Sequence, residues 1–147
     1  MCVVKTGSCL GGGTSGPGFT YPRGYTQFMS TDHGKAVLDD LAPLTRDLRK
    51  AIPDVYDGFR SLHGAAFAPG GALEVRHKEL IALAIAVATE CDGCIASHAR
   101  AAVKAGASKE ECADALGVTI LMGGGPATIW APRAYAAFCE FYDAAGS

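Results

Sequence analysis

The sequence has little charge and gathers none of it in one place. Charged residues make up 19% of the 147 residues, the formal net charge is −2, and no stretch concentrates lysine and arginine. Proteins that bind nucleic acid usually carry a basic patch, so we expect no nucleic-acid partner. No uninterrupted apolar run reaches the ~18 residues that a membrane helix needs, so we expect no membrane partner either.

The sequence also lacks an export signal and a disulfide framework. Its beginning, Met1-Cys2-Val3-Val4-Lys5, has no apolar segment like that of a signal peptide. The six cysteines are not densely spaced; they occupy positions 2, 9, 91, 94, 112 and 139. We therefore expect a cytoplasmic protein with reduced thiols. In that compartment a CxxC pair is more often catalytic or metal-binding than structural.

Residues 1–30 differ in composition from the rest of the chain. They contain many glycines, among them the run Gly11-Gly12-Gly13, and show no helical or strand period. We interpret this region as a disordered or extraneous Gly-rich segment, followed by one domain over residues 31–147. Met29-Ser30-Thr31 looks like an ordinary protein start, so residues 1–28 are expected to be dispensable.

The remaining residues show helical spacing and no convincing strand alternation, which predicts an all-α fold. We expect a single-domain bundle of about six helices, near residues 35–48, 53–68, 73–89, 92–105, 109–122 and 126–142. Gly106 is expected to end the fourth in a left-handed conformation, and Ser108 with Glu111 forms a capping box for the fifth. The helix over 73–89 is apolar nearly all round, so it should be buried on most sides. That is more apolar surface than a lone small domain needs to cover, which predicts an oligomer.

The most chemically specific stretch runs from Cys91 through Cys94 to His98. On a helix, positions i, i+3 and i+7 lie on one face, so the two thiols and the imidazole would be neighbours. The start of a helix supplies partial positive charge and unpaired N–H groups, which stabilise a thiolate. His98, one turn after Cys94, can accept the proton of that thiol. This pattern predicts a redox or metal site.

Glu79 lies near the start of the apolar segment, and two interpretations of it stand equal. It is either a solvated first-turn carboxylate, favoured there by the helix dipole, or a buried group that is paired and used. In the second case it would orient His98 as the third member of a relay. Glu90, three helical turns further on, is expected to share its face and is the other candidate for that role.

Other interpretations of the motif remain open. Cys91, Cys94, His98 and Glu79 could together bind zinc or another soft metal, although three ligands within eight residues of one helix would crowd a tetrahedron. The scaffold could also serve a lyase or an interaction module without thiol chemistry. His63, near the end of the second helix, is interpreted as a solvated or core histidine, with a role in the site as the less favoured alternative, and Cys112 and Cys139 as buried small apolar residues.

These residues resemble the active-site pattern of the alkylhydroperoxidase D-like group, which belongs to the carboxymuconolactone decarboxylase family. The resemblance covers about residues 40–143. It rests on Glu79 with Cys91-x-x-Cys94-x-x-x-His98, and on the stretches 78–84, 105–111 and 122–127. It implies an all-helical subunit that assembles into a homotrimer or hexamer, with no cofactor and no metal. The implied substrate is a hydroperoxide, and the implied electron donor is a thiol or dithiol, such as a lipoyl- or thioredoxin-type protein.

The resemblance also implies a role for each site residue. Glu79 and His98 would form the proton relay, Cys94 would attack the peroxide, and Cys91 would resolve the intermediate as a disulfide. One position departs from the pattern: the best-known peroxidase members carry a second histidine just before the second cysteine, where this sequence has Gly93. Decarboxylase members of the wider family lack the cysteine pair, so the pair argues against lactone decarboxylation.

Overall fold

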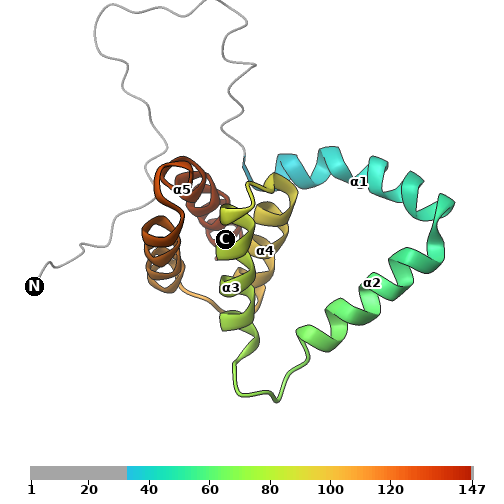
Figure 1. The fold of residues 1–147 in the computed structure, drawn as a ribbon, viewed down its shortest axis with the longest axis horizontal. Coiled ribbons are helices and arrows are strands. Elements are labelled where there is room, and N and C mark those ends of the chain that lie inside the picture. Colours follow the sequence, from blue (N-terminus) through green and yellow to red (C-terminus); the bar gives the residue numbers. More distant parts are fainter. Residues whose placement is uncertain (1–32, 147) are drawn as a thin grey trace, which may run out of the picture. The chain divides into compact units, whose positions relative to one another are not determined.

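The computed structural model describes residues 33–146 and is all-helical over that range (Figure 1). Five helices follow one another: α1 (Lys35–Ala51), α2 (Pro53–Ala66), α3 (Val75–Ala88), α4 (Asp92–Lys104) and α5 (Lys109–Ala145). The predicted all-α class is confirmed, and this part of the chain contains no strand. The predictions for residues 1–30, including Cys2 and Cys9, and for a start at Met29 lie outside the described residues.

Helices α3, α4 and α5 pack against one another, and we refer to these three as the core. Many of the side chains buried between them are alanines, which allow the helix backbones to approach closely. The largest fully buried side chains are Leu83, Val87, Ile95, Cys112 and Phe138. The helix that begins with the functional motif therefore belongs to the three-helix core, where the described chain buries its largest side chains.

Helix α5 contains a break where the sequence predicted a boundary between two helices. Gly124 has φ 61° and ψ −140°, a conformation outside the helical region, so two helical segments meet there at a kink. The sequence-based expectation of six helices thus differs from the five observed only in how this kink is counted. Pro126 follows the kink, as expected for the first turn of a new segment.

Helix α5 is also the one helix in the described range that is long and apolar enough to cross a membrane by those two criteria alone. The kink at Gly124 interrupts it, however, and its second half belongs to the core. Ala131, Ala134 and Phe138 are buried there against the other core helices. The second half therefore makes the contacts of a core helix, whereas only 22% of the most apolar 18-residue stretch of α5 is buried within the subunit.

Helices α1 and α2 form a second region, which we call the arm. Neither helix contains a buried residue, although their apolar side chains recur at helical spacing. The exposed apolar residues of the arm are Leu41, Leu44, Leu48, Ile52, Val55, Phe59 and Leu62. The helical pattern was therefore predicted correctly, but within one subunit the apolar face has no cover.

The arm is attached to the core at both ends by charged side chains. At its beginning, the Lys35 backbone N–H donates to Glu140 Oε1 of α5 over 3.1 Å. A carboxylate at a helix N-terminus also interacts favourably with the helix dipole. At its end, Lys78 Nζ of α3 donates to the carbonyl oxygens of Ala66 and Ala68, over 3.1 and 2.8 Å. The lysine satisfies carbonyl groups that the end of α2 leaves without helical partners.

Helix α3 departs from the prediction that it is buried on most sides. Leu80, Leu83 and Val87 are buried, but Ile81 is 49% and Ile85 58% exposed. The reason is that α4 and α5 cover one side of α3, while no described element covers the opposite side. The exposed apolar side chains of α3 therefore form a second uncovered apolar surface, in addition to that of the arm.

Two helices end in the same hydrogen-bond pattern with different residues at the left-handed position. Gly106, with φ 85°, follows α4 as predicted. Glu90, with φ 55°, follows α3, and the N–H groups of Glu90 and Cys91 bond to the carbonyls of Val87 and Ala86. This is a Schellman motif, in which glycine is usual. The expectation that Glu90 lies on the same helix face as Glu79 is wrong, because α3 ends before it.

The predicted capping box at the start of α5 is confirmed. Glu111 N–H donates to Ser108 Oγ over 3.2 Å, and Ser108 N–H donates to Glu111 Oε2 over 2.8 Å. The pair satisfies two backbone donors at the helix start and fixes the turn between α4 and α5.

Candidate functional site

The two cysteines of the motif form a disulfide at the start of α4. Cys91 is the N-cap residue and Cys94 lies in the first turn, with their Cα atoms 5.2 Å apart. The Cys91 sulfur also accepts a hydrogen bond from the backbone N–H of Cys94 over 3.3 Å. Cys94 is exposed, whereas Cys91 is half-buried. The redox-capable pair is therefore formed, and its second sulfur is the more accessible one.

Glu79 of α3 forms a close pair with His98 of α4, the helix that begins at the disulfide. Glu79 Oε2 lies 2.7 Å from His98 Nδ1, and Glu79 is only 4% exposed. Of the two interpretations of Glu79, the buried and paired one holds. Since an ionised carboxylate can only accept, Nδ1 carries the hydrogen and Nε2 of a neutral imidazole remains free to accept a proton. The partial exposure of His98 keeps that atom reachable.

The arm contributes two rings to the same site. His63 stacks on Phe67 with centroids 4.5 Å apart, and the His98 ring lies 5.8 Å from Phe67 and 6.4 Å from His63. His63 is thus neither a core residue nor a purely solvated one. The sequence shows only that His63 and Phe67 are four residues apart and share a helix face. Their approach to His98 depends on the Lys78 contact that holds the end of α2.

Gly93, between the two cysteines, is in contact range of the arm. A Cβ atom built at Gly93 would lie 2.6 Å from Leu41 Cδ1 of α1. Related peroxidases carry a histidine at the corresponding place, according to the resemblance described above. In this chain that space holds the leucine side chain, and the second imidazole near His98 comes from α2 instead.

Two further carboxylates lie near the motif. Glu90 is exposed and precedes Cys91 in its left-handed turn, so it does not share the buried position of Glu79. Asp92 lies in the first turn of α4, where the helix dipole favours a negative charge, and its Oδ1 is buried with no hydrogen-bond partner in residues 33–146. Glu79 is therefore the carboxylate that contacts His98.

The remaining predicted cysteines of the helical domain are buried, as expected for small apolar side chains. Cys112 of α5 is fully buried, and burial raises the pKa of its thiol to about 12. Cys139 is 3% exposed and disulfide-bonded, so it is buried as expected but is not a free thiol. A thiol with so high a pKa as that of Cys112 is a poor nucleophile near neutral pH.

The metal alternative requires four ligands gathered at one point. Within residues 33–146 no group of three or more histidine, cysteine, aspartate or glutamate side chains is placed to hold a metal ion. Both sulfurs are joined in the disulfide and Glu79 bonds to His98. The geometry therefore favours the redox interpretation over a four-ligand metal site.

Similar proteins come from several bacteria. An uncharacterized protein of Cupriavidus necator is 38% identical over 91 residues, which are 62% of this chain and 80% of that protein. An uncharacterized protein encoded in the cox locus of Paracoccus denitrificans is 37% identical over 91 residues, 62% of this chain and 81% of its own length.

Two solved structures are also similar to this chain. A carboxymuconolactone decarboxylase family protein from Legionella pneumophila superposes with a TM-score of 0.70 and 42% identity, covering 73% of this chain and 95% of that one. A protein from Burkholderia xenovorans, 21% identical with a TM-score of 0.62, shares the fold over 82% of this chain and 90% of its own. The sequence model of the carboxymuconolactone decarboxylase family matches residues 53–144, which include Glu79, both cysteines and His98. The chain belongs to the carboxymuconolactone decarboxylase family.

Proposed function

We propose that this protein is a thiol-dependent peroxidase of the alkylhydroperoxidase D-like kind. The observation that carries the proposal is the Cys91–Cys94 disulfide at a helix start, one turn from a histidine held by a buried glutamate. In the net reaction a hydroperoxide ROOH and a dithiol donor give an alcohol ROH, water and the donor's disulfide. The protein alternates between its dithiol and disulfide forms.

Cys94 is the thiol that attacks the peroxide, because it is the exposed member of the pair. His98 Nε2 accepts the proton of the Cys94 thiol, and the thiolate attacks the terminal oxygen of ROOH. The O–O bond breaks, an S–O bond forms, and the departing alkoxide takes the proton from His98 as it leaves as ROH. Cys94 is then a sulfenic acid.

Cys91 closes the disulfide and later leaves it. Its thiolate attacks the Cys94 sulfur, the S–O bond breaks, and hydroxide takes up the Cys91 proton to form water. In the reductive half-reaction, a donor thiolate attacks the exposed Cys94 sulfur and Cys91 leaves as thiolate. The Cys94 N–H, which already bonds to the Cys91 sulfur, stabilises that leaving group. The donor's second thiol then attacks the mixed disulfide, releases Cys94 and carries away the oxidation as a donor disulfide.

Glu79 supports these proton transfers through its contact with His98 Nδ1. Its carboxylate fixes the Nδ1–H tautomer of His98 and stabilises the imidazolium that forms when Nε2 takes a proton. Burial beside α4 keeps water from competing for that hydrogen bond. The arm's rings, His63 and Phe67, limit the orientations open to His98 from the other side.

We further propose that the subunit works as a homotrimer or a larger assembly. The support is the exposed apolar side chains of the arm from Leu44 to Leu62, together with Ile81 and Ile85 of α3 and Leu121 and Met122 of α5, the last two 80% and 81% exposed. Exposed apolar surface on this scale is typical of protein interfaces. A second copy of the chain offers the matching helices.

The function is tested by following consumption of an organic hydroperoxide with dithiothreitol, dihydrolipoamide or thioredoxin as donor. We expect turnover by the wild type and none by Cys91→Ser or Cys94→Ser. After one equivalent of peroxide, Cys91→Ser should retain a trappable sulfenic acid at Cys94. Trapping only in Cys94→Ser would reverse the two roles. Absence of sulfenic acid in both variants would refute thiol peroxidase chemistry, and metal analysis of the purified protein would then test the alternative.

A further inference from the structure

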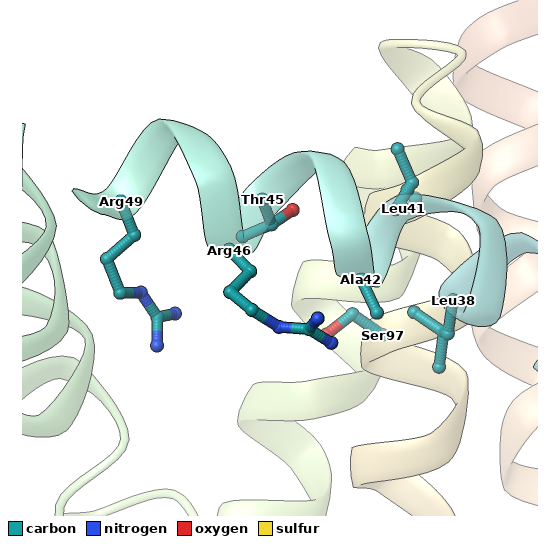
Figure 2. A pocket seen from close by; sticks show the side chains of 8 residues that line it. Leu38, Leu41, Ala42, Thr45, Arg46, Arg49 and Ser97 are labelled. Carbon is teal, nitrogen blue, oxygen red and sulfur yellow. The ribbon is translucent and has the colours of Figure 1, made fainter. Parts of the chain in front are cut away.

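A pocket of about 430 Å³ lies between α1 of the arm and the first turns of α4 (Figure 2). We propose that this pocket binds the carboxylate of an acidic organic hydroperoxide, so that the preferred oxidising substrate is a hydroperoxide carried on an apolar chain with a carboxylate. The proposal rests on the peroxidase function proposed above and names its substrate class.

The pocket adjoins the reactive pair. Gly93, which separates the two cysteines, and Ser97, which precedes His98, both form part of its wall. A ligand in the pocket therefore lies against the same helix turns that carry Cys94 and His98. Gly93 has no side chain, and the Leu41 side chain, which also lines the pocket, lies against it.

The charged part of the pocket is positive. Arg46 and Arg49, three residues apart on α1, both line it, and none of its eight lining residues is acidic. The Arg49 guanidinium lies 5.3 Å from the centre of the Tyr56 ring. Arg46 forms no hydrogen bond or ion pair with any residue between 33 and 146, and Figure 2 shows its guanidinium extending toward Ser97. A guanidinium without an internal partner matches a carboxylate, which it can bind through two parallel hydrogen bonds.

The rest of the pocket is largely apolar. Leu38, Leu41 and Ala42 of α1 form that part of the wall, while Thr45 adds one hydroxyl. A volume of this size is in the range of pockets that hold small organic ligands, and it far exceeds what hydrogen peroxide would fill. The lining thus fits a molecule with an anionic end at Arg46 and an apolar body along the leucines.

The first test compares two substrates that differ at the carboxyl end, where one is a carboxylate and the other an uncharged methyl ester. We choose the hydroperoxide of linoleic acid and that of its methyl ester, and measure kcat/KM for the full chain with one fixed dithiol donor. We expect the wild type to prefer the acid by roughly 10-fold or more, as for a hydrogen bond to a charged group. Arg46→Gln should reduce this preference to below about 3-fold through a higher KM for the acid, and Arg46→Lys should retain part of it.

Arg100→Gln is the matched control, because Arg100 is an exposed residue of α4 outside the pocket lining and the change removes the same charge. It should keep the wild-type preference. An equal kcat/KM for acid and ester in the wild type, or an equal loss of preference in Arg46→Gln and Arg100→Gln, would overturn the proposal.

The second test does not need turnover. Titration calorimetry measures octanoate binding to the oxidised protein, with octanol as the uncharged comparison. We expect the wild type and Arg100→Gln to bind octanoate and Arg46→Gln to bind it at least 10-fold more weakly. If the wild type consumes no peroxide but shows this binding pattern, the peroxidase function fails and the carboxylate pocket stands. If peroxide is consumed but octanoate does not bind, the pocket proposal fails alone.

Discussion

The core and the arm carry apolar side chains at the same helical spacing, but only the core buries them within the subunit. Phe138 of α5 is fully buried, whereas Phe59 of α2 is 64% exposed. The core is held by packing among three helices, whereas the arm contacts the core through α1, through ring contacts with His98 and through a hydrogen bond to a charged side chain at each end. The contrast shows that amphipathic spacing predicts that a helix face will be covered, without indicating which molecule covers it.

Substitution of the two phenylalanines should separate the regions most clearly. Phe138→Ala is expected to lower the free energy of unfolding by about 3–5 kcal/mol, because it leaves a cavity in a packed core. Phe59→Glu should instead leave each subunit folded and shift the protein to smaller species. Urea titration measures the first effect, and sedimentation velocity at micromolar concentration the second. A wild type that sediments as a monomer would contradict the assignment of the arm to subunit contact.

Thiol alkylation should distinguish the buried core from the accessible site by about three orders of magnitude. With a pKa of about 12 instead of the ordinary 9.0, Cys112 has a thiolate fraction near 10⁻⁴ at pH 8, against roughly one tenth for an unperturbed thiol. Iodoacetamide should label Cys94 in the reduced native protein and spare Cys112, as peptide mass spectrometry can show. Because the folded pKa is raised, this thiol's contribution to stability is lost as the pH rises above 9. Rapid native labelling of Cys112 would show that the core opens.

Glu79→Gln tests the partner that the core gives to His98. The change keeps the shape of the side chain but removes the anion that supports the imidazole, so the thiol loses an effective proton acceptor. We expect the fold to be kept and the rate of Cys94 alkylation near neutral pH to fall by about an order of magnitude or more. The pH profile of iodoacetamide alkylation provides the measurement, with Glu90→Gln as the control. Superimposable profiles for wild type and Glu79→Gln would remove Glu79 from the relay.

His63→Ala tests the partner that the arm gives to the same histidine. Aromatic contacts of this kind contribute about 0.5–1.5 kcal/mol, which corresponds to roughly 2- to 10-fold in rate. We expect such a decrease in Cys94 reactivity, smaller than that of Glu79→Gln, and recovery with His63→Phe if stacking alone matters. If Cys94 reacts as slowly in His63→Phe as in His63→Ala, the imidazole has a role in proton transfer. An effect as large as that of Glu79→Gln would make the arm an equal part of the site.

The smallest expected effect concerns the turn between core helices. Glu90→Gly should stabilise the protein by up to about 1 kcal/mol, since glycine adopts the left-handed conformation without the cost that a side chain incurs. The thermal unfolding midpoint measures the gain, and Gly106→Ala, at the equivalent turn after α4, should show the opposite sign. Loss of stability in Glu90→Gly would mean that the glutamate side chain makes a compensating interaction.

Much of the helical framework could be predicted from local sequence signals. The capping box at Ser108, the glycine stop at Gly106 and the break near Gly124 each depend on a few neighbouring residues. The motif spacing from Cys91 to His98 also follows from helix geometry alone. These features are short-range, so the sequence contains all that is needed to find them.

The features that could not be predicted depend on contacts between residues far apart in the sequence. Nothing in an all-round apolar helix shows which face turns inward, so the burial of Glu79 and the exposure of Ile81 could not be told apart beforehand. His63 reaches the site because Lys78 holds the end of α2, fifteen residues away in sequence. Glu90 ends a helix in a conformation that its residue type disfavours, and pattern rules expect glycine there.

The contact between Gly93 and Leu41 has a consequence for how such sequences can vary. The Leu41 Cδ1 methyl occupies the space that a Cβ atom at position 93 would need, so a larger residue there requires the leucine side chain to move. A histidine before the second cysteine therefore requires another Leu41 rotamer, a shorter residue at position 41 or a shift of α1 away from α4. The CxxC motif and the first helix are therefore expected to co-evolve, although they lie some fifty residues apart. Grafting a relative's motif into this chain should be better tolerated when the matching first helix is transferred with it.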